Sequence, residues 1–257
     1  MSSQYDSIGT RYNNIKALPV ASIELHSVRS ALGDISGLRC LDLACGVGYY
    51  SQKLVGWGAA HVVGVDISAE MVKGAQEACK GDSRLEFFVG DCADPRQWAL
   101  SSREQQIREE KGFDLVLGAW LLNYASSEAE LLSMWRNIHC NLKPGGRFVG
   151  ITPNMSLDMS EPLDDRYGIT ARGIQKVEHG WKVRLTVYTA PKIEFETYHL
   201  NDGVYETTAA AAGMEHLEWE NILLPDGEKK DSGYWDEFVR RPHAGICTAV
   251  RPRGDSV

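Results

Sequence analysis

Acidic residues and glycines recur where short apolar runs of this sequence end. Asp42 lies near the end of RCLDLA and is followed by Gly46 and Gly48, Asp66 ends HVVGVD, and Asp91 comes just after LEFFV. Carboxylates accept hydrogen bonds from hydroxyl and amine groups, and glycines let a ligand approach the backbone closely. These residue types at this spacing therefore point to a site for a polar ligand that carries hydroxyls and amines.

The elements that must position these residues alternate between apolar strands and amphipathic helices. The predicted strands are Arg39 to Ala44, His61 to Asp66, Leu85 to Val89, Phe113 to Ala119 and Arg147 to Thr152. The predicted helices are Val20 to Leu32, Tyr49 to Val55, one with Ser68 as its N-cap, and Glu128 to Leu142. This alternation is typical of a parallel sheet covered by helices, in which the carboxyl ends of the strands share one edge. The acids and glycines are therefore expected to converge there.

The pattern changes after Thr152. Pro153 to Gly173 is irregular, and Trp181 to Tyr188 with Ile193 to Leu200 predicts an antiparallel hairpin that could serve as a lid. A helix over Asn201 to Ala212 and a strand pair, Met214 to Ile222 with Ile246 to Val250, complete the chain, while Cys92 to Gly112 is predicted as a helix plus a solvated loop.

The sequence predicts an α/β fold of Rossmann-like, doubly wound type. Its seven-stranded, mostly parallel sheet carries an inserted antiparallel lid after the fifth strand. The predicted parts of this one globular domain are an N-terminal helical cap (1–37), a ligand-binding core (38–152), a substrate lid (153–200) and a C-terminal completion of the sheet (201–257).

The composition of the chain argues against several classes of protein. The chain of 257 residues has 27 Lys and Arg against 35 Asp and Glu, a net charge of −8, which argues against a nucleic-acid partner. Met1 to Lys16 lacks the apolar run of a signal peptide and no later run is long enough to span a membrane, so a soluble, cytoplasmic protein without membrane partners is expected. The six cysteines form no CxxC pair and are expected to be free thiols, and no cluster has metal-ligand spacing. A monomer or weak homodimer is expected.

Two cofactor classes fit the strand-end residues. A dinucleotide site favours GxGxxG, but this turn reads GVGYYS, with Ser51 in place of the third glycine. The negative charge of Asp42 would oppose a pyrophosphate and suit a cationic amino-acid group such as that of S-adenosylmethionine. Asp66 could then accept hydrogen bonds from the ribose hydroxyls, and Asp91 with the Cys92 backbone could meet the adenine amine.

Five motifs in order, LDLACGVGYYS, VVGVDIS, FVGDCAD, FDLVLGAWLLNYA and LKPGGRFV, resemble those of class I S-adenosylmethionine-dependent methyltransferases over Leu38 to Ile151. QYDSIG, AWLLNYA and YWDEF are similar to the toxoflavin N-methyltransferase type of small-molecule methyltransferase. The resemblance implies metal-independent methyl transfer from S-adenosylmethionine to a small heterocyclic or aromatic acceptor of secondary metabolism, at nitrogen first. S-adenosylhomocysteine would be the product, and catalysis would rest on proximity and orientation.

The resemblance also implies roles for individual residues. The implied cofactor contacts are Tyr5, Tyr12, Asp42, Ala44, Gly46, Gly48, Asp66, Ile67, Met71, Asp91, Cys92, Ala119 and Trp120. From their places at strand ends and in the lid, we assign Trp120, Tyr124 and His199 to catalysis, with His199 as a proton acceptor. Trp120, Asn123, Thr152, Tyr198 and Trp235 are the predicted substrate contacts.

Each assignment has a structural alternative. Trp120, Tyr124 and Trp235 could be packing residues, the Thr152 hydroxyl could bond to the backbone, and His199 could be a solvated surface residue. Three alternatives to N-methylation are open: methylation at oxygen, sulfur or carbon, a regulatory protein that binds S-adenosylmethionine without turnover, and a nicotinamide-dependent oxidoreductase. The last is opposed by Asp42 and the missing third glycine.

Overall fold

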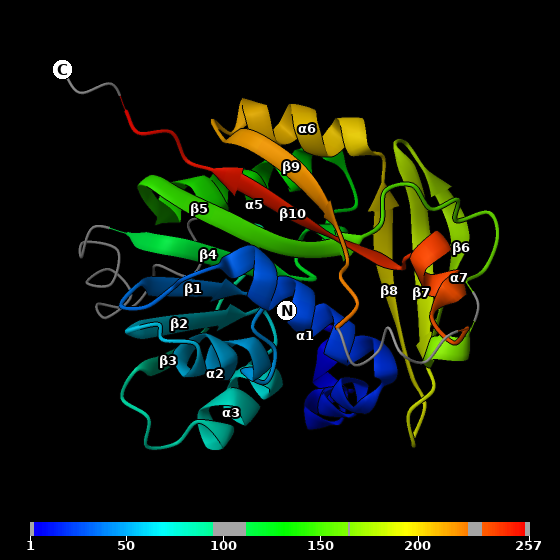
Figure 1. Cartoon of the computed structure of the whole chain (residues 1–257), viewed down its shortest axis with the longest axis horizontal. Coiled ribbons are helices and arrows are strands. Elements are labelled where there is room, and N and C mark those ends of the chain that lie inside the picture. Colours follow the sequence, from blue (N-terminus) through cyan, green and yellow to red (C-terminus); the bar gives the residue numbers. More distant parts are fainter. Residues whose placement is uncertain (1–2, 95–111, 164, 226–232, 255–257) are drawn as a thin grey trace.

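A seven-stranded sheet organises the molecule (Figure 1). The computed structural model describes residues 3–94, 112–163, 165–225 and 233–254. The strands of this sheet are β1 (Arg39–Leu43), β2 (His61–Asp66), β3 (Leu85–Val89), β4 (Phe113–Ala119), β5 (Leu142–Pro153), β9 (Glu215–Asn221) and β10 (Ala244–Val250). Their order is β3-β2-β1-β4-β5-β10-β9, with β1 to β5 parallel and β10 antiparallel to both its neighbours. This confirms the predicted fold class.

Helices cover both faces of the sheet. They are α1 (Pro19–Leu32), α2 (Tyr49–Gly56), α3 (Ala69–Ala78), α5 (Glu128–Asn141) and α6 (Asp202–Ala211). The short α7 (Asp236–Arg240) lies beside the small sheet, and its Phe238 packs in a cluster with Val20 and Ile23 of α1. Leu115 and Leu117 of β4 pack in the cluster that contains side chains of α1 and α2, whereas Val116 packs in the cluster that contains side chains of α5 and α6. Because successive side chains of a strand point to opposite faces, β4 must be apolar throughout, which is why its sequence reads as a continuous hydrophobic run.

Several predicted boundaries hold. β2, β3 and β4 have the predicted bounds, and the Ser68 side chain accepts a hydrogen bond from the Met71 N–H at the start of α3. Strand β5 begins at Leu142, earlier than the predicted Arg147, because Leu142 already pairs with Phe113 of β4 before the register shifts at the glycine turn. Most of the segment predicted over Cys92 to Gly112 lies outside the described residues.

The second sheet has three strands instead of a hairpin. It consists of β6 (Ile169–Val177), β7 (Gly180–Val187) and β8 (Ile193–Leu200), all antiparallel. The prediction that Pro153 to Gly173 is irregular was therefore wrong from Ile169 onward. Strand β6 lies at the edge of this sheet and buries few side chains, so its sequence ITARGIQKV lacks the apolar alternation that reveals a strand.

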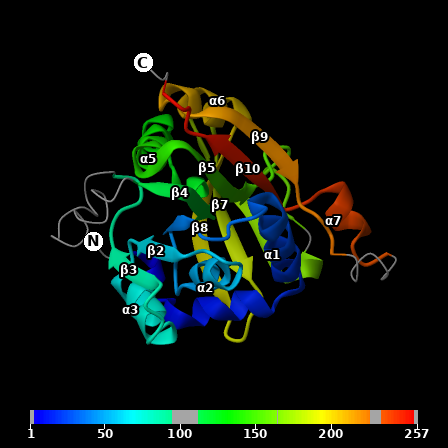
Figure 2. The same cartoon turned by 60° about the vertical axis from the view of Figure 1, so that its left-hand side comes forward.

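The N-terminal segment contacts both the small sheet and the large one, and lies beside them in Figures 1 and 2. It contains two 3₁₀ helices, η1 (Gln4–Asp6) and η2 (Gly9–Ala17). Ile8 and Ile15 pack against Val187, Ile193 and Phe195 of the small sheet. On the other side, the Ser68 hydroxyl donates a 2.6 Å hydrogen bond to Asp6. The segment thus connects the small sheet to the start of α3.

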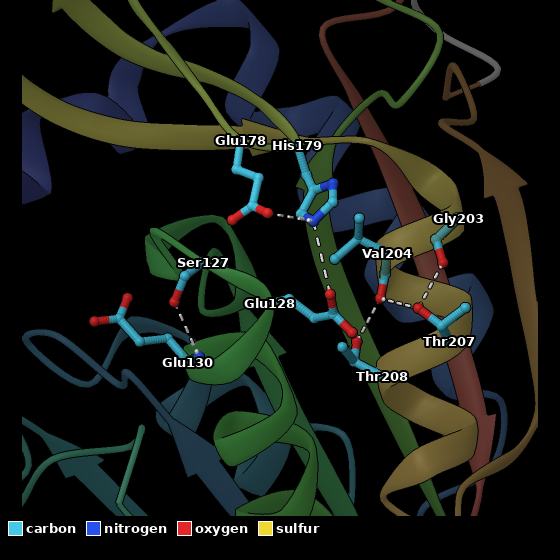
Figure 3. A network of polar contacts seen from close by, with 9 residues as sticks. All are labelled: Ser127, Glu128, Glu130, Glu178, His179, Gly203, Val204, Thr207 and Thr208. Carbon is cyan, nitrogen blue, oxygen red and sulfur yellow. Dashed lines mark hydrogen bonds and ion pairs between the residues drawn. The ribbon is translucent and has the colours of Figure 1, made fainter.

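The turn between β6 and β7 makes a second connection, shown in Figure 3. His179 Nε2 lies 3.6 Å from Glu128 Oε2 at the start of α5 and 3.9 Å from Glu178 Oε1. The His179 carbonyl accepts the Asn201 N–H at 2.9 Å, just before α6. Because His179 and Glu128 are partly exposed, the backbone bond holds this junction more firmly than the ion pair does. No helix among the described residues is long and apolar enough to cross a membrane.

Candidate functional site

Two cavities adjoin at the carboxyl edge of the large sheet. The first, which we call the strand-end pocket, encloses about 580 Å³ of empty space, open solvent at its mouth included. The second, which we call the lid pocket, encloses about 860 Å³ counted in the same way and includes residues of all three strands of the small sheet in its wall. Such positions at the carboxyl ends of parallel strands are where ligands bind in open α/β sheets.

The strand-end pocket brings together residues from the N-terminal segment and from the ends of β1, β2 and β4. Of the predicted cofactor residues, its wall contains Tyr5, Tyr12, Ala44, Gly46, Asp66, Met71, Ala119 and Trp120; it also contains Asn13, Lys16, Cys45, Val47, Tyr49, Tyr50 and Tyr124. The sequence therefore brought the strand ends and the two N-terminal tyrosines to this pocket. It missed two further N-terminal residues and four residues of the glycine turn and the start of α2: Asn13, Lys16, Cys45, Val47, Tyr49 and Tyr50.

The turn after β1 is tied to the end of β2 through Asp66. The Gly46 N–H donates to Asp66 Oδ2 and the Ser68 N–H donates to Oδ1, both at 2.9 Å. Gly46 has a φ of +54°, which a residue with a side chain rarely adopts, and a Cβ there would meet nothing within 4 Å. Burial raises the pKa of Asp66, and the two backbone hydrogen bonds oppose that rise. Each oxygen keeps a lone pair for a further donor.

Asp42 lies behind the strand-end pocket and is not part of its wall. Its side chain is 1% exposed, and Oδ2 accepts a 2.6 Å hydrogen bond from the Ser51 hydroxyl at the start of α2. Burial raises the pKa of Asp42 to about 7, against the smaller effect of the Ser51 hydrogen bond. Asp42 thus joins β1 to the start of α2 on the far side of the glycine turn, and its contact with a ligand ammonium stays a prediction.

Tyrosines from the N-terminal segment cover the pocket. The Tyr5 and Tyr124 hydroxyls share a hydrogen bond, and the Tyr5 ring packs edge-on against Tyr12 and Tyr124, with centroids 5.6 and 5.8 Å apart. Burial raises the pKa of all three phenols. They are thus neutral hydrogen-bonding groups at physiological pH.

Four side chains line both pockets and form what we call the shared wall: Tyr12, Lys16, Trp120 and Tyr124. Trp120 follows β4 with a φ of +62°, and its backbone N–H donates a 3.0 Å hydrogen bond to the Ile151 carbonyl. This left-handed conformation is costly for a bulky residue and often marks functional positions. Lys16 Nζ lies 4.8 and 4.9 Å from the ring centres of Tyr49 and Tyr50.

The lid pocket is mainly apolar, with a few convergent polar side chains. Glu24, Asn123, Thr197 and His199 line it together with aliphatic residues from α1, the small sheet and the segment after β5. His199 is 5% exposed, so it is not the solvated surface residue of the alternative interpretation. Burial lowers the pKa of His199, whereas its hydrogen bonds to the backbone of Met155 and Leu157 raise that pKa by a smaller amount. A largely neutral imidazole can accept a proton.

Some predicted residues lie outside both walls. Gly48, Ile67, Asp91 and Cys92 are absent from the strand-end pocket, and Thr152, Tyr198 and Trp235 from the lid pocket. The Thr152 hydroxyl donates to the Pro153 carbonyl, and Trp235 stacks on Tyr167 at 5.1 Å inside an aromatic cluster. Thr197 and His199 occupy the pocket face of β8, so the intervening Tyr198 points away. The sequence reveals strand ends but not which face of an inserted strand looks inward.

Two charged residues of the site were missed, Lys16 and Glu24. Glu24 is 4% exposed, and its Oε2 lies 3.3 Å from Trp120 Nε1 and 3.8 Å from Lys16 Nζ. A signal for it exists in the sequence, because Val20, Glu24 and Ser27 share one face of the predicted helix, and a carboxylate on a buried face needs a partner. Lys16 lies in a 3₁₀ segment with no periodic pattern, and nothing marks it.

The chain is similar in sequence and in fold to known methyltransferases. Residues 40–146 match the family model described as "Methyltransferase domain". The chain is 27% identical over 246 residues to an uncharacterized protein of Haemophilus influenzae, covering 92% of each. It is 31% identical to a demethylmenaquinone methyltransferase of Clavibacter sepedonicus over 58% of this chain and 56% of that one. A methyltransferase structure from Mesorhizobium loti has a TM-score of 0.64 at 22% identity, covering 89% of this chain and 98% of that chain.

Two further relatives are named as an mRNA cap guanine-N(7) methyltransferase of Caenorhabditis elegans and a tRNA U34 carboxymethyltransferase of Aeromonas hydrophila, matched over 47% and 53% of this chain. The chain spans only 32% and 39% of their lengths. These matches show a methyltransferase domain over residues 40–146 and, over most of the chain, the fold of an S-adenosylmethionine-dependent methyltransferase. They do not extend to the toxoflavin type or to a particular acceptor.

Proposed function

We propose that this protein transfers a methyl group from S-adenosylmethionine to a small, largely apolar heterocyclic or aromatic acceptor, with nitrogen as the preferred atom. The observation that carries the proposal is the shared wall, because two ligands bound in adjoining pockets would meet there. Holding two reactants in such a geometry can supply about 7–11 kcal/mol of the barrier reduction.

The strand-end pocket fits the cofactor by its donors and acceptors. Asp66 would receive the ribose hydroxyls, and the open space beside Gly46 would admit the ligand close to the backbone. The rings of Tyr5 and Tyr12 would cover it. When bound, the cofactor supplies a methyl group already activated on a sulfonium sulfur. The protein's own task is then to orient the acceptor and exclude water.

The lid pocket supplies that orientation. Its aliphatic walls suit a flat apolar molecule, and Trp120 and Tyr124 lie between it and the strand-end pocket. We assign to Trp120 and Tyr124 the positioning of acceptor and methyl group. His199 is the candidate proton acceptor, because it is buried in the lid pocket and largely neutral. The net charge of −8 supports a small molecule over RNA.

Calorimetric titration with S-adenosylmethionine, S-adenosylhomocysteine and NADH tests the cofactor assignment. Binding of both adenosyl ligands with NADH silent is expected, and silence from both adenosyl ligands would overturn it. A methyl-transfer assay over heterocycles, phenols, thiols and a short RNA then tests the acceptor class. Transfer to RNA with none to the small molecules would contradict the proposal.

A further inference from the structure

Two of the polar residues that line the lid pocket, Glu24 and Asn123, contact the shared wall. Glu24 is in contact with Trp120 and Lys16, and Asn123 forms a side-chain hydrogen bond with Tyr124. Trp120, Lys16 and Tyr124 all belong to the shared wall. Both polar residues therefore lie at the end of the lid pocket where a methyl group would arrive.

Asn123 presents a hydrogen-bond acceptor without a protein donor. The residue is 3% exposed, and its Oδ1 atom has no hydrogen-bond partner within the described part of the chain. Leaving a buried polar atom unsatisfied costs about 1–3 kcal/mol. An N–H or O–H group on a bound molecule would satisfy it, and His199 Nδ1 of the same pocket is likewise without a partner within the described residues.

Glu24 presents a second acceptor. Its contacts with Trp120 and Lys16 both use Oε2, and in residues 3–94, 112–163, 165–225 and 233–254 no hydrogen bond to Oε1 is found. Lys16 balances the charge of Glu24, so this end of the pocket does not need a cationic ligand. It needs a donor.

We propose that Glu24 and Asn123 select the acceptor, by receiving hydrogen bonds from N–H or O–H groups on the edge of a flat apolar ring. This inference rests on the proposed function and names the feature that an acceptor must carry. Molecules of the same shape without such a donor would leave both oxygens unsatisfied and bind more weakly. Glu24 and Asn123 are thus specificity-determining residues for the orientation of the acceptor.

The test uses a matched pair of probes, indole and 1-methylindole, which share a bicyclic ring but differ in one N–H donor. Their dissociation constants are measured by ligand-observed NMR on the full chain, with and without S-adenosylhomocysteine. Indole is expected to bind about five- to tenfold more tightly, the ratio that one hydrogen bond in a buried site provides. Equal affinities, or no binding of either probe, would overturn the inference.

Variants identify the residues responsible. Glu24→Leu and Asn123→Leu are expected to reduce the indole preference toward one, whereas Glu24→Gln and Asn123→Asp keep an acceptor oxygen and should keep a preference. Glu218→Gln, on exposed strand β9, is the control and should bind like the unmodified protein. An undiminished preference in both leucine variants, with native circular dichroism spectra, would overturn the assignment.

Failure of the proposed function gives a different result. If S-adenosylhomocysteine does not bind while the indole preference and its loss in the leucine variants are observed, the cofactor assignment fails and the donor-selecting pocket stands. If S-adenosylhomocysteine binds and the probes do not discriminate, the cofactor assignment stands and the selection by Glu24 and Asn123 fails.

Discussion

The buried carboxyl group behind the glycine turn makes protein stability depend on pH. Asp42 has a pKa of about 7 in the folded protein, chiefly because burial disfavours its charged form. Of the groups that face it, Asp66 raises this pKa further, while the Ser51 hydrogen bond and Lys16 lower it. In the unfolded chain the same group titrates near its ordinary value of 3.8.

Between these two pKa values the folded protein holds a proton that the unfolded chain has released. The free energy of unfolding must therefore fall as pH rises from about 4 to about 7. For a single group with the pKa values above, the fall between pH 5 and pH 8 is about 2.5 kcal/mol. Asp42→Asn removes the titrating carboxyl group, while the amide oxygen of the new side chain can still accept the Ser51 hydrogen bond. The free energy of unfolding of this variant should therefore not show the decrease of about 2.5 kcal/mol between pH 5 and pH 8.

Urea unfolding at pH 5, 6, 7 and 8 measures the effect. The free energy of Asp42→Asn minus that of the unmodified protein should grow by about 2.5 kcal/mol over this range. Glu218→Gln on β9 serves as the control, with a difference that stays constant. If Asp42→Asn and the unmodified protein show the same pH slope, the carboxyl group is ionised in the folded state and the burial argument is refuted.

Three further substitutions test the site and the lid. Asp66→Ala should weaken S-adenosylhomocysteine binding by about 1.5–3 kcal/mol, the range for hydrogen bonds to charged groups; an unchanged dissociation constant in calorimetry would remove Asp66 from the ribose site. Gly46→Val, at a φ of +54°, should abolish that binding while the circular dichroism spectrum stays near native, and retained binding would mean that the ligand does not approach this turn. His179→Gln should lower the free energy of unfolding by less than about 1 kcal/mol, because its ion pair with Glu128 is partly exposed. A larger loss in urea unfolding would show that this junction holds the lid to α5.

The central sheet was predictable because its signals are local. Strands such as Phe113–Ala119 are buried on both faces and read as continuous apolar runs, and Ser68 marks the start of α3 by its own side chain. The ends of parallel strands share one edge, so the convergence of Gly46 and Asp66 follows from the strand assignment alone. The class of ligand followed from the same residues.

Tertiary contacts decided which side chains line the lid pocket. How the small sheet packs determines that the His199 side chain points into the lid pocket and that the Tyr198 side chain points away from it. The edge strand β6 has too little alternation of apolar and polar residues to be predicted from the sequence. Glu24 and Lys16 are far from the strand ends in the chain and reach the shared wall only because α1 and the N-terminal segment fold across the sheet edge. The sequence by itself thus determined the sheet, the glycine turn and the cofactor class, whose signals lie within single elements. The tertiary structure alone decided which side chains from separate elements face one another across the lid pocket.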